Sequence, residues 1–153
     1  MHAFRTLGIL TGLAAAFANL AGAAPGQAAS AISTAGDRCP ARATAMLVQG
    51  STLCVSTDDP TQALRPQLLR GWIERSAHIV ADYYGHFPAP LVELRIRAAP
   101  GGGVGGGRTT NESGLVIQMS VGREVTADEL TADWVLVHEM VHLALPEIGR
   151  RHN

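Results

Sequence analysis

Hydrophobic and polar positions alternate most clearly between residues 91 and 97. Val92, Leu94 and Ile96 fall on one side of an extended chain, and charged residues fall on the other side. Because successive side chains of a strand point to opposite faces, this pattern predicts a strand with one covered face. A second strand is predicted over 115–121, where a run that is apolar on both faces is typical of the interior of a sheet.

Between residues 67 and 84 the apolar positions recur at three and four residues, which predicts an amphipathic helix. These positions are Leu69, Trp72, Ile73, Val80, Tyr83 and Tyr84. Gly85 and two prolines are expected to end the helix, and we interpret its tyrosine pair as core packing. Two short strands are predicted within 45–55, on either side of a turn at Gly50 and Ser51.

The capping-box pattern of Thr126 and Glu129 predicts the start of a last helix, which is expected to run to about Leu145. Before it lies a glycine-rich stretch, 101–107, whose spacing formally satisfies the G-x-G-x-x-G pattern of dinucleotide-binding loops. No helix pattern follows directly, so no helix N-terminus is available to hold a pyrophosphate. We therefore interpret the stretch as a flexible loop between strands.

The chain has 153 residues, which is enough for one domain with a hydrophobic core. All twelve basic residues are arginine, and thirteen residues are acidic. This weakly acidic balance gives no support for nucleic-acid binding. An arginine-only basic set in a chain rich in alanine and glycine is typical of GC-rich bacteria, although this is an association and not a physical argument.

Residues 1–23 have the pattern of a secretory signal peptide: a basic start, an apolar run, and small residues at the cleavage-type positions. Residues 24–36 are mostly small residues, as in a linker, and 37–153 are expected to form one domain. No stable membrane span is expected after signal cleavage. Cys39 and Cys54 suit one local disulfide in an oxidising compartment, so we expect a secreted or periplasmic protein.

The last predicted helix carries an H-E-x-x-H motif at His138, Glu139 and His142. Two histidines four residues apart lie on the same helix face, so both imidazoles can reach one zinc ion, Zn²⁺. Glu139 would lie beside that ion, where its carboxylate can take a proton from a water molecule. His78 and His86 lack such spacing, and we interpret both as surface or helix-end residues.

Residues 135–144 match the longer pattern of the zincin metallopeptidases, and the chain resembles this family there. The resemblance implies that His138 and His142 are zinc ligands, that Glu139 is the catalytic base, and that the substrate is a peptide or protein. It also implies an α+β fold, the N-terminal half of a zincin-like domain, in which a small mixed sheet packs beside the motif helix and a second long helix. An edge strand, either 91–97 or 115–121, would then pair with the extended substrate.

The third zinc ligand distinguishes the branches of this family. The metzincin pattern requires a glycine at position 145 and a histidine at position 148, where this chain has Leu145 and Ile148. The gluzincin branch takes a glutamate from a later helix, and this ligand is expected beyond Asn153, in a longer version of the protein. Glu147 and His152 are the nearby substitutes, although neither spacing matches a known pattern.

Three interpretations therefore stay open. The chain is a zinc peptidase whose third ligand comes from within the chain or from a partner, or it is a non-enzymatic zinc-binding or interaction module. The third interpretation is a small secreted structural domain without a metal. Zinc binding separates the third interpretation from the first two, and proteolysis that depends on Glu139 separates the first from the second.

Overall fold

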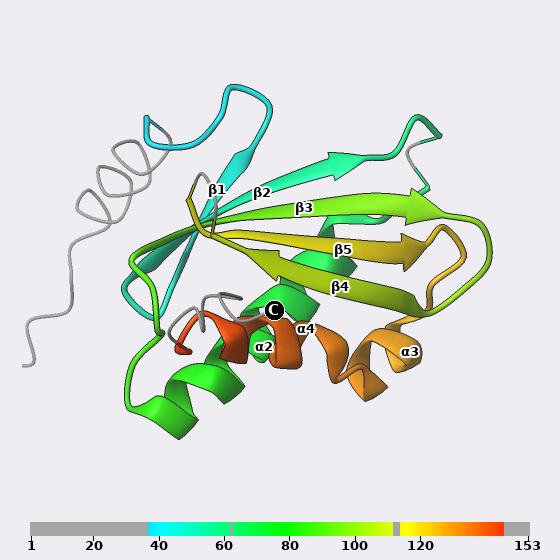
Figure 1. The fold of residues 1–153 in the computed structure, drawn as a ribbon. Coiled ribbons are helices and arrows are strands. Elements are labelled where there is room, and N and C mark those ends of the chain that lie inside the picture. The colour runs from blue at the N-terminus through cyan, green and yellow to red at the C-terminus, as the bar shows by residue number, and fades with distance from the viewer. Residues whose placement is uncertain (1–36, 62, 112–113, 146–153) are drawn as a thin grey trace, which may run out of the picture.

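The computed structural model describes residues 37–61, 63–111 and 114–145, which form a five-stranded mixed sheet and three helices (Figure 1). The strands are β1 (Thr44–Val48), β2 (Ser51–Asp58), β3 (Leu91–Ala99), β4 (Val104–Thr110) and β5 (Val116–Gly122). The helices are α2 (Pro66–Tyr84), α3 (Ala127–Ala132) and α4 (Val135–His142). This mixed composition of helices and sheet agrees with the predicted α+β class.

The strands lie in the order β1-β2-β3-β5-β4. The inner pairs β2/β3 and β3/β5 are parallel, whereas the outer pairs β1/β2 and β4/β5 are antiparallel. The strands predicted from alternation, β3 and β5, therefore both lie inside the sheet. The hairpin of β1 and β2 turns at Gln49 and Gly50, with φ of 51° and 77°, one residue earlier than the predicted Gly-Ser turn.

The glycine-rich stretch is not the flexible loop that its composition predicts. Gly101 and Gly103, with φ of 81° and 68°, turn the chain, and β4 then pairs with residues 116–121 of β5. The backbone hydrogen bonds that the edge of β5 offers outweigh the low strand propensity of glycine. The prediction that 91–97 or 115–121 is an edge strand beside the site is therefore wrong, because the two edge strands are β1 and β4, and β4 is the one next to α4.

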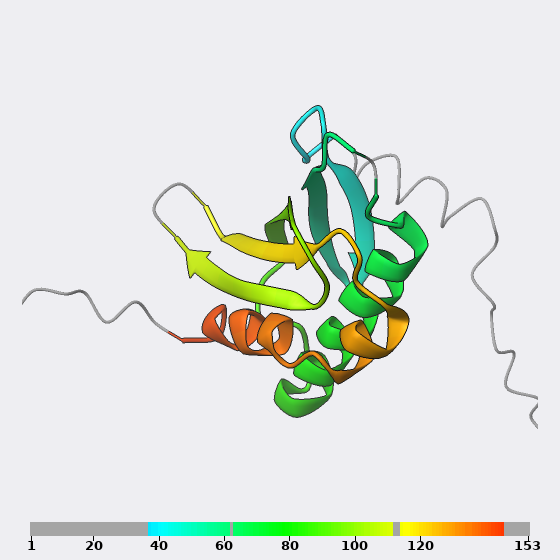
Figure 2. The same ribbon diagram turned by 90° about the vertical axis from the view of Figure 1, so that its right-hand side faces the viewer.

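All three helices lie on one face of the sheet, as Figure 2 shows. The apolar stripe of α2 is buried in the same core as the inner side chains of β3 and β5, which confirms the helix and most of its predicted core positions. Tyr83 is the exception, because its side chain is 81% exposed, while its neighbour Tyr84 is half-buried. Gly85 ends the helix with φ of 79°, as predicted.

The predicted last helix is in fact two helices. The capping box at its start is present, with Thr126 and Glu129 each accepting a backbone N–H of the other. The chain then leaves the helical conformation at Asp133, which has φ of −69° and ψ of 133°, and α4 begins two residues later. The separation lets α3 and α4 take different directions against α2 (Figure 2).

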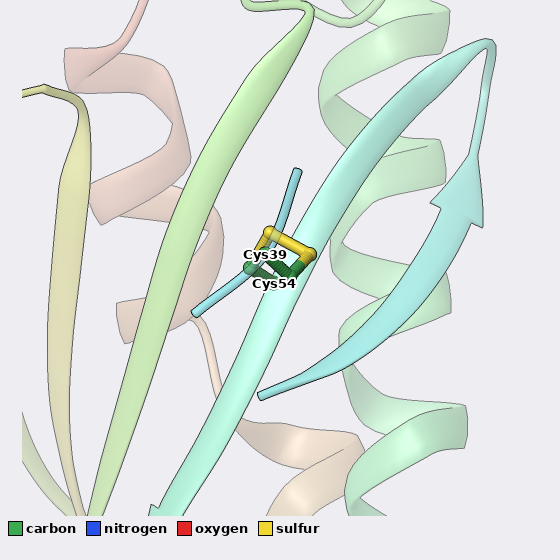
Figure 3. Close-up of a disulfide and its surroundings, with 2 residues drawn as sticks. All are labelled: Cys39 and Cys54. Carbon is green, nitrogen blue, oxygen red and sulfur yellow. A yellow bond between two sulfur atoms is a disulfide. The ribbon is translucent and has the colours of Figure 1, made fainter. Parts of the chain in front are cut away.

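A disulfide joins Cys39 to Cys54 of β2, as the sequence predicts (Figure 3). It ties the segment before β1 to the middle of β2, on the face of the sheet away from the helices. Within the described residues, no helix is both long and apolar enough to cross a membrane. The predicted signal peptide (1–23), the linker (24–36) and the last eight residues, including Glu147 and His152, lie outside the described residues.

Candidate metal centre and active site

Helix α4, which carries the H-E-x-x-H motif, is held in place by Asp133. Its carboxylate accepts the backbone N–H groups of Val135 (3.1 Å) and Leu136 (3.2 Å), two of the groups that a helix start leaves without partners. The same carboxylate accepts the indole N–H of Trp72, at 2.9 Å. Trp72 is buried in the middle of α2. The side chain of Asp133 therefore both caps the start of α4 and joins α4 to α2.

The two motif histidines lie side by side on the solvent-facing surface of α4. Their Nε2 atoms are 3.1 Å apart, and their rings are nearly perpendicular, with 4.7 Å between centroids. The exposed ring of Trp134, one turn earlier, lies edge-on to His138 with a centroid distance of 5.4 Å. Both Nε2 atoms therefore converge on one point in front of the helix.

This separation suits a shared metal ion. Two nitrogen atoms bound to one tetrahedral zinc ion at about 2.0–2.1 Å each lie about 3.3–3.4 Å apart. The observed Nε2 separation of 3.1 Å is within a few tenths of an ångström of that value. The same separation allows an Nε2–H···Nε2 hydrogen bond in the metal-free chain, so the geometry is compatible with zinc without requiring it.

Glu139 is directed away from solvent, between α4 and the edge strand β4. The residue is only 6% exposed. Its Oε2 atom lies 2.7 Å from the hydroxyl of Thr109, and the same hydroxyl lies 2.8 Å from the backbone carbonyl oxygen of Glu139. Because residues 107 and 109 of β4 face α4, this strand forms the floor against which the carboxylate lies.

Gly107 makes this close approach possible. A Cβ atom at this position would lie 2.6 Å from Cγ of Glu139 and 2.6 Å from the sulfur of Met119. Those distances are shorter than ordinary Cβ contacts, so any larger residue would require Glu139 or Met119 to shift. Part of the glycine-rich stretch therefore shapes the site, although its composition suggests only flexibility.

A catalytic zinc site uses three protein ligands, and His138 and His142 could supply two of them. No group of three or more His, Cys, Asp or Glu side chains in this part of the chain could hold a metal ion. His78 is engaged with the side chain of Gln49, and His86 follows the end of α2. A third ligand would therefore have to come from outside the described residues or from another molecule.

Three residues of the site were not predicted from the sequence. An aspartate just before an apolar helical run is a common signal for a helix start, so the role of Asp133 carries a local signature. Thr109 and Gly107 carry no local sequence signature, because each contacts Glu139 from a segment about thirty residues away in the chain.

No protein-family model matches this chain, and no curated protein or solved structure is significantly similar to it. The function is therefore inferred from the geometry of the site and from the local resemblance of the motif.

Proposed function

We propose that the protein is a secreted or periplasmic zinc-dependent peptidase with a zincin-like domain, in which His138 and His142 hold the metal and Glu139 is the catalytic base. The observation that carries the proposal is the convergence of the two exposed Nε2 atoms, 3.1 Å apart, on a helix that also carries the buried side chain of Glu139. Both rings are exposed, so a metal ion can reach the two nitrogen atoms from solvent.

A zinc ion held by the two imidazoles would lower the pKa of a water molecule and polarise the carbonyl of the peptide bond. The role of Glu139 would be to accept the proton of that water and to pass it to the leaving amine. The hydroxyl of Thr109 would hold the carboxylate in position for both steps. Because Glu139 is buried against β4, few water molecules compete for its oxygens.

The edge strand supports the choice of a peptide as substrate. In the described sheet β4 pairs only with β5, so its outer edge leaves backbone N–H and C=O groups without strand partners. An extended peptide can add to such an edge through main-chain hydrogen bonds. Because residues 107 and 109 of the same strand contact Glu139, a peptide bound there would lie close to the motif helix.

Zinc binding is the first test of this proposal. Zinc content and competition with a chelating dye would be measured on the purified, processed protein. Substituting His138→Ala or His142→Ala should each lower the affinity at least tenfold, because each removes one of few ligands. The matched control, His86→Ala, removes an exposed histidine that follows α2 and should leave the zinc affinity unchanged. Equal zinc binding by all four proteins would reject the site.

Peptide hydrolysis is the second test, measured on casein and on a mixed peptide library. Activity should be lost with a zinc chelator and restored by zinc. Glu139→Gln should lower turnover by roughly a hundredfold or more, the usual contribution of general acid–base catalysis. Glu124→Gln, which changes an exposed carboxylate outside the site, is the matched control. Full activity in Glu139→Gln would exclude the proposed mechanism.

One observation favours a second candidate, a zinc-binding module without catalytic activity. The described residues offer only two ligands, and a site with fewer ligands binds zinc more weakly. Zinc binding that needs both histidines, without hydrolysis of any peptide, would support this candidate over the peptidase. Absence of zinc binding in the unmodified protein would exclude both the peptidase and the zinc-binding module. The interpretation as a structural domain without a metal would then be the one left.

A further inference from the structure

The face of the sheet opposite the helices, which we call the open face, carries a concentration of arginine side chains. Arg95 and Arg97 extend from β3 and Arg108 extends from β4, all on this face by the register of the strands. Arg42, just before β1, lines the same shallow concavity, which has a volume of about 740 Å³. All four arginines are exposed.

Few carboxylates balance this charge. Glu93 is paired with Arg95 through two parallel contacts of 2.8 Å, from Nε to Oε1 and from Nη2 to Oε2. Asp58 lies opposite Arg97 on the neighbouring strand but is not within ion-pair distance of it. Within the described residues, Arg42, Arg97 and Arg108 have no ion-pair partner. The open face is therefore positive although the whole chain has a net charge of −1.

We propose that the open face binds an acidic polypeptide segment in an extended conformation. Arg95 and Arg97 are two residues apart on one strand, so their backbones are about 6.5–7 Å apart, the same spacing as alternate residues of an extended peptide. One carboxylate of a partner would thus meet the guanidinium group of Arg97, and a second, two residues away, would meet the N–H groups of Arg95 that Glu93 leaves free. Guanidinium groups bind carboxylates in a planar two-bond geometry, which the pair of Arg95 and Glu93 already adopts on this face.

The lining of the concavity argues against other anionic partners. None of its described lining residues is aromatic, so nucleic-acid bases would find no stacking surface. The exposed large hydrophobic residues, including Trp134 and Tyr83, are not among the lining residues either, so a lipid surface would gain no apolar anchor here. Polar side chains such as Ser56, Gln118 and Ser120 fill the space between the arginines and can bond a peptide backbone.

The parts of this sequence that lie outside the described residues contain few carboxylates. Residues 1–36 contain no Asp or Glu, and residues 146–153 contain one glutamate and two arginines. The partner of this proposal is a separate polypeptide, with two or more carboxylates at alternate positions. This inference does not depend on the proposed hydrolysis, because the arginines lie on the opposite face of the sheet from α4.

The test is a fluorescence anisotropy titration of the full, processed protein with a labelled ten-residue peptide of alternating serine and glutamate. We expect saturable binding that weakens with added salt, and at least tenfold weaker binding of the matched serine–glutamine peptide. Arg97→Gln and Arg108→Gln should each weaken binding about tenfold, the effect of losing one charge-assisted hydrogen bond. Arg70→Gln, an exposed arginine of α2, removes the same charge elsewhere and should have little effect.

Several outcomes would overturn the proposal. One is an equal loss of binding in Arg70→Gln and Arg97→Gln, which would indicate a general charge effect. Tighter binding of a single-stranded oligonucleotide or of anionic lipid vesicles than of the peptide would assign the face to another partner. Self-association that is lost in the arginine variants would assign it to a second copy of the chain. Glu139→Gln should bind the peptide normally, which keeps this test separate from the test of hydrolysis.

Discussion

The hydroxyl oxygen of Thr109 lies 2.7 Å from Oε2 of Glu139 and 2.8 Å from the backbone carbonyl oxygen of the same residue. A hydroxyl has one proton to donate and two lone pairs to accept with. It can donate to the carboxylate, or it can accept from the protonated acid while it donates to the carbonyl. Thr109 can therefore hold the side chain of Glu139 both before and after a proton transfer.

We expect Thr109→Val to release the Glu139 carboxylate from β4. The free energy of unfolding should fall by about 1 kcal/mol, the net value of one hydrogen bond, in urea titrations. If the protein is a peptidase, kcat should fall about tenfold or more, because Glu139 is no longer held in position. KM should change little, because the substrate-binding site is unchanged. Thr109→Ser should restore both values.

The matched control for that change is Thr110→Val, on the opposite face of the same strand. It should leave kcat unchanged. Equal effects of the two substitutions on kcat would mean that Thr109 acts only through the stability of β4 and does not position Glu139.

Gly107→Ala should be poorly tolerated, because the new methyl group would lie 2.6 Å from both Glu139 Cγ and the sulfur of Met119. Forcing these groups apart should lower the free energy of unfolding by about 1–3 kcal/mol, the usual cost of overpacking. Gly105→Ala is the control, since its methyl group would make only ordinary contacts with Ser120, at 3.6–3.7 Å. Thermal unfolding would compare the two, and an unchanged Tm in Gly107→Ala would show that the contact with Glu139 is loose.

Asp133→Ala should separate the start of α4 from α2. The substitution removes the two backbone bonds at the helix start and leaves the indole N–H of Trp72 without its acceptor. We expect a loss of about 2–3 kcal/mol in the free energy of unfolding, from the lost cap together with an unsatisfied polar group. Asp82→Ala, at an exposed position of α2, should change stability by less than about 0.5 kcal/mol. Similar losses in both variants would contradict this role of Asp133.

The stability of the fold should depend on acid through Asp59. The backbone N–H of Leu64, together with the hydroxyl and N–H of Thr61, lowers the pKa of Asp59 below its ordinary value of 3.8. Because the folded pKa is the lower one, its stabilising contribution is complete above the ordinary value and is lost as the pH falls through the folded pKa. Asp59→Asn should therefore be less stable at pH 7 and should lose less stability between pH 5 and pH 2, measured by urea unfolding.

Asp82→Asn is the control for that experiment, because it removes an exposed carboxylate of α2. It should show the same acid dependence as the unmodified protein. If Asp59→Asn also keeps the full acid dependence, the hydrogen bonds from Leu64 and Thr61 do not stabilise the charged form.

The sequence alone determined the elements whose signal is local. Alternation identified β3 and β5, the apolar period identified α2, and the spacing of the two cysteines suggested their disulfide. The histidine pair belongs to this class as well, because residues four apart on any helix lie on one face. In each case the information lies within a few residues of the chain, or within one short loop.

The tertiary structure alone decided the features that depend on distant segments. The glycine-rich stretch became β4 because the edge of β5 offered it hydrogen bonds, and the last helix divided where Asp133 met Trp72 of α2. The same holds for Glu139, which lies buried against Thr109 because β4 passes beneath α4. Composition and periodicity describe one segment at a time, whereas these contacts form only when segments far apart in the chain are brought together.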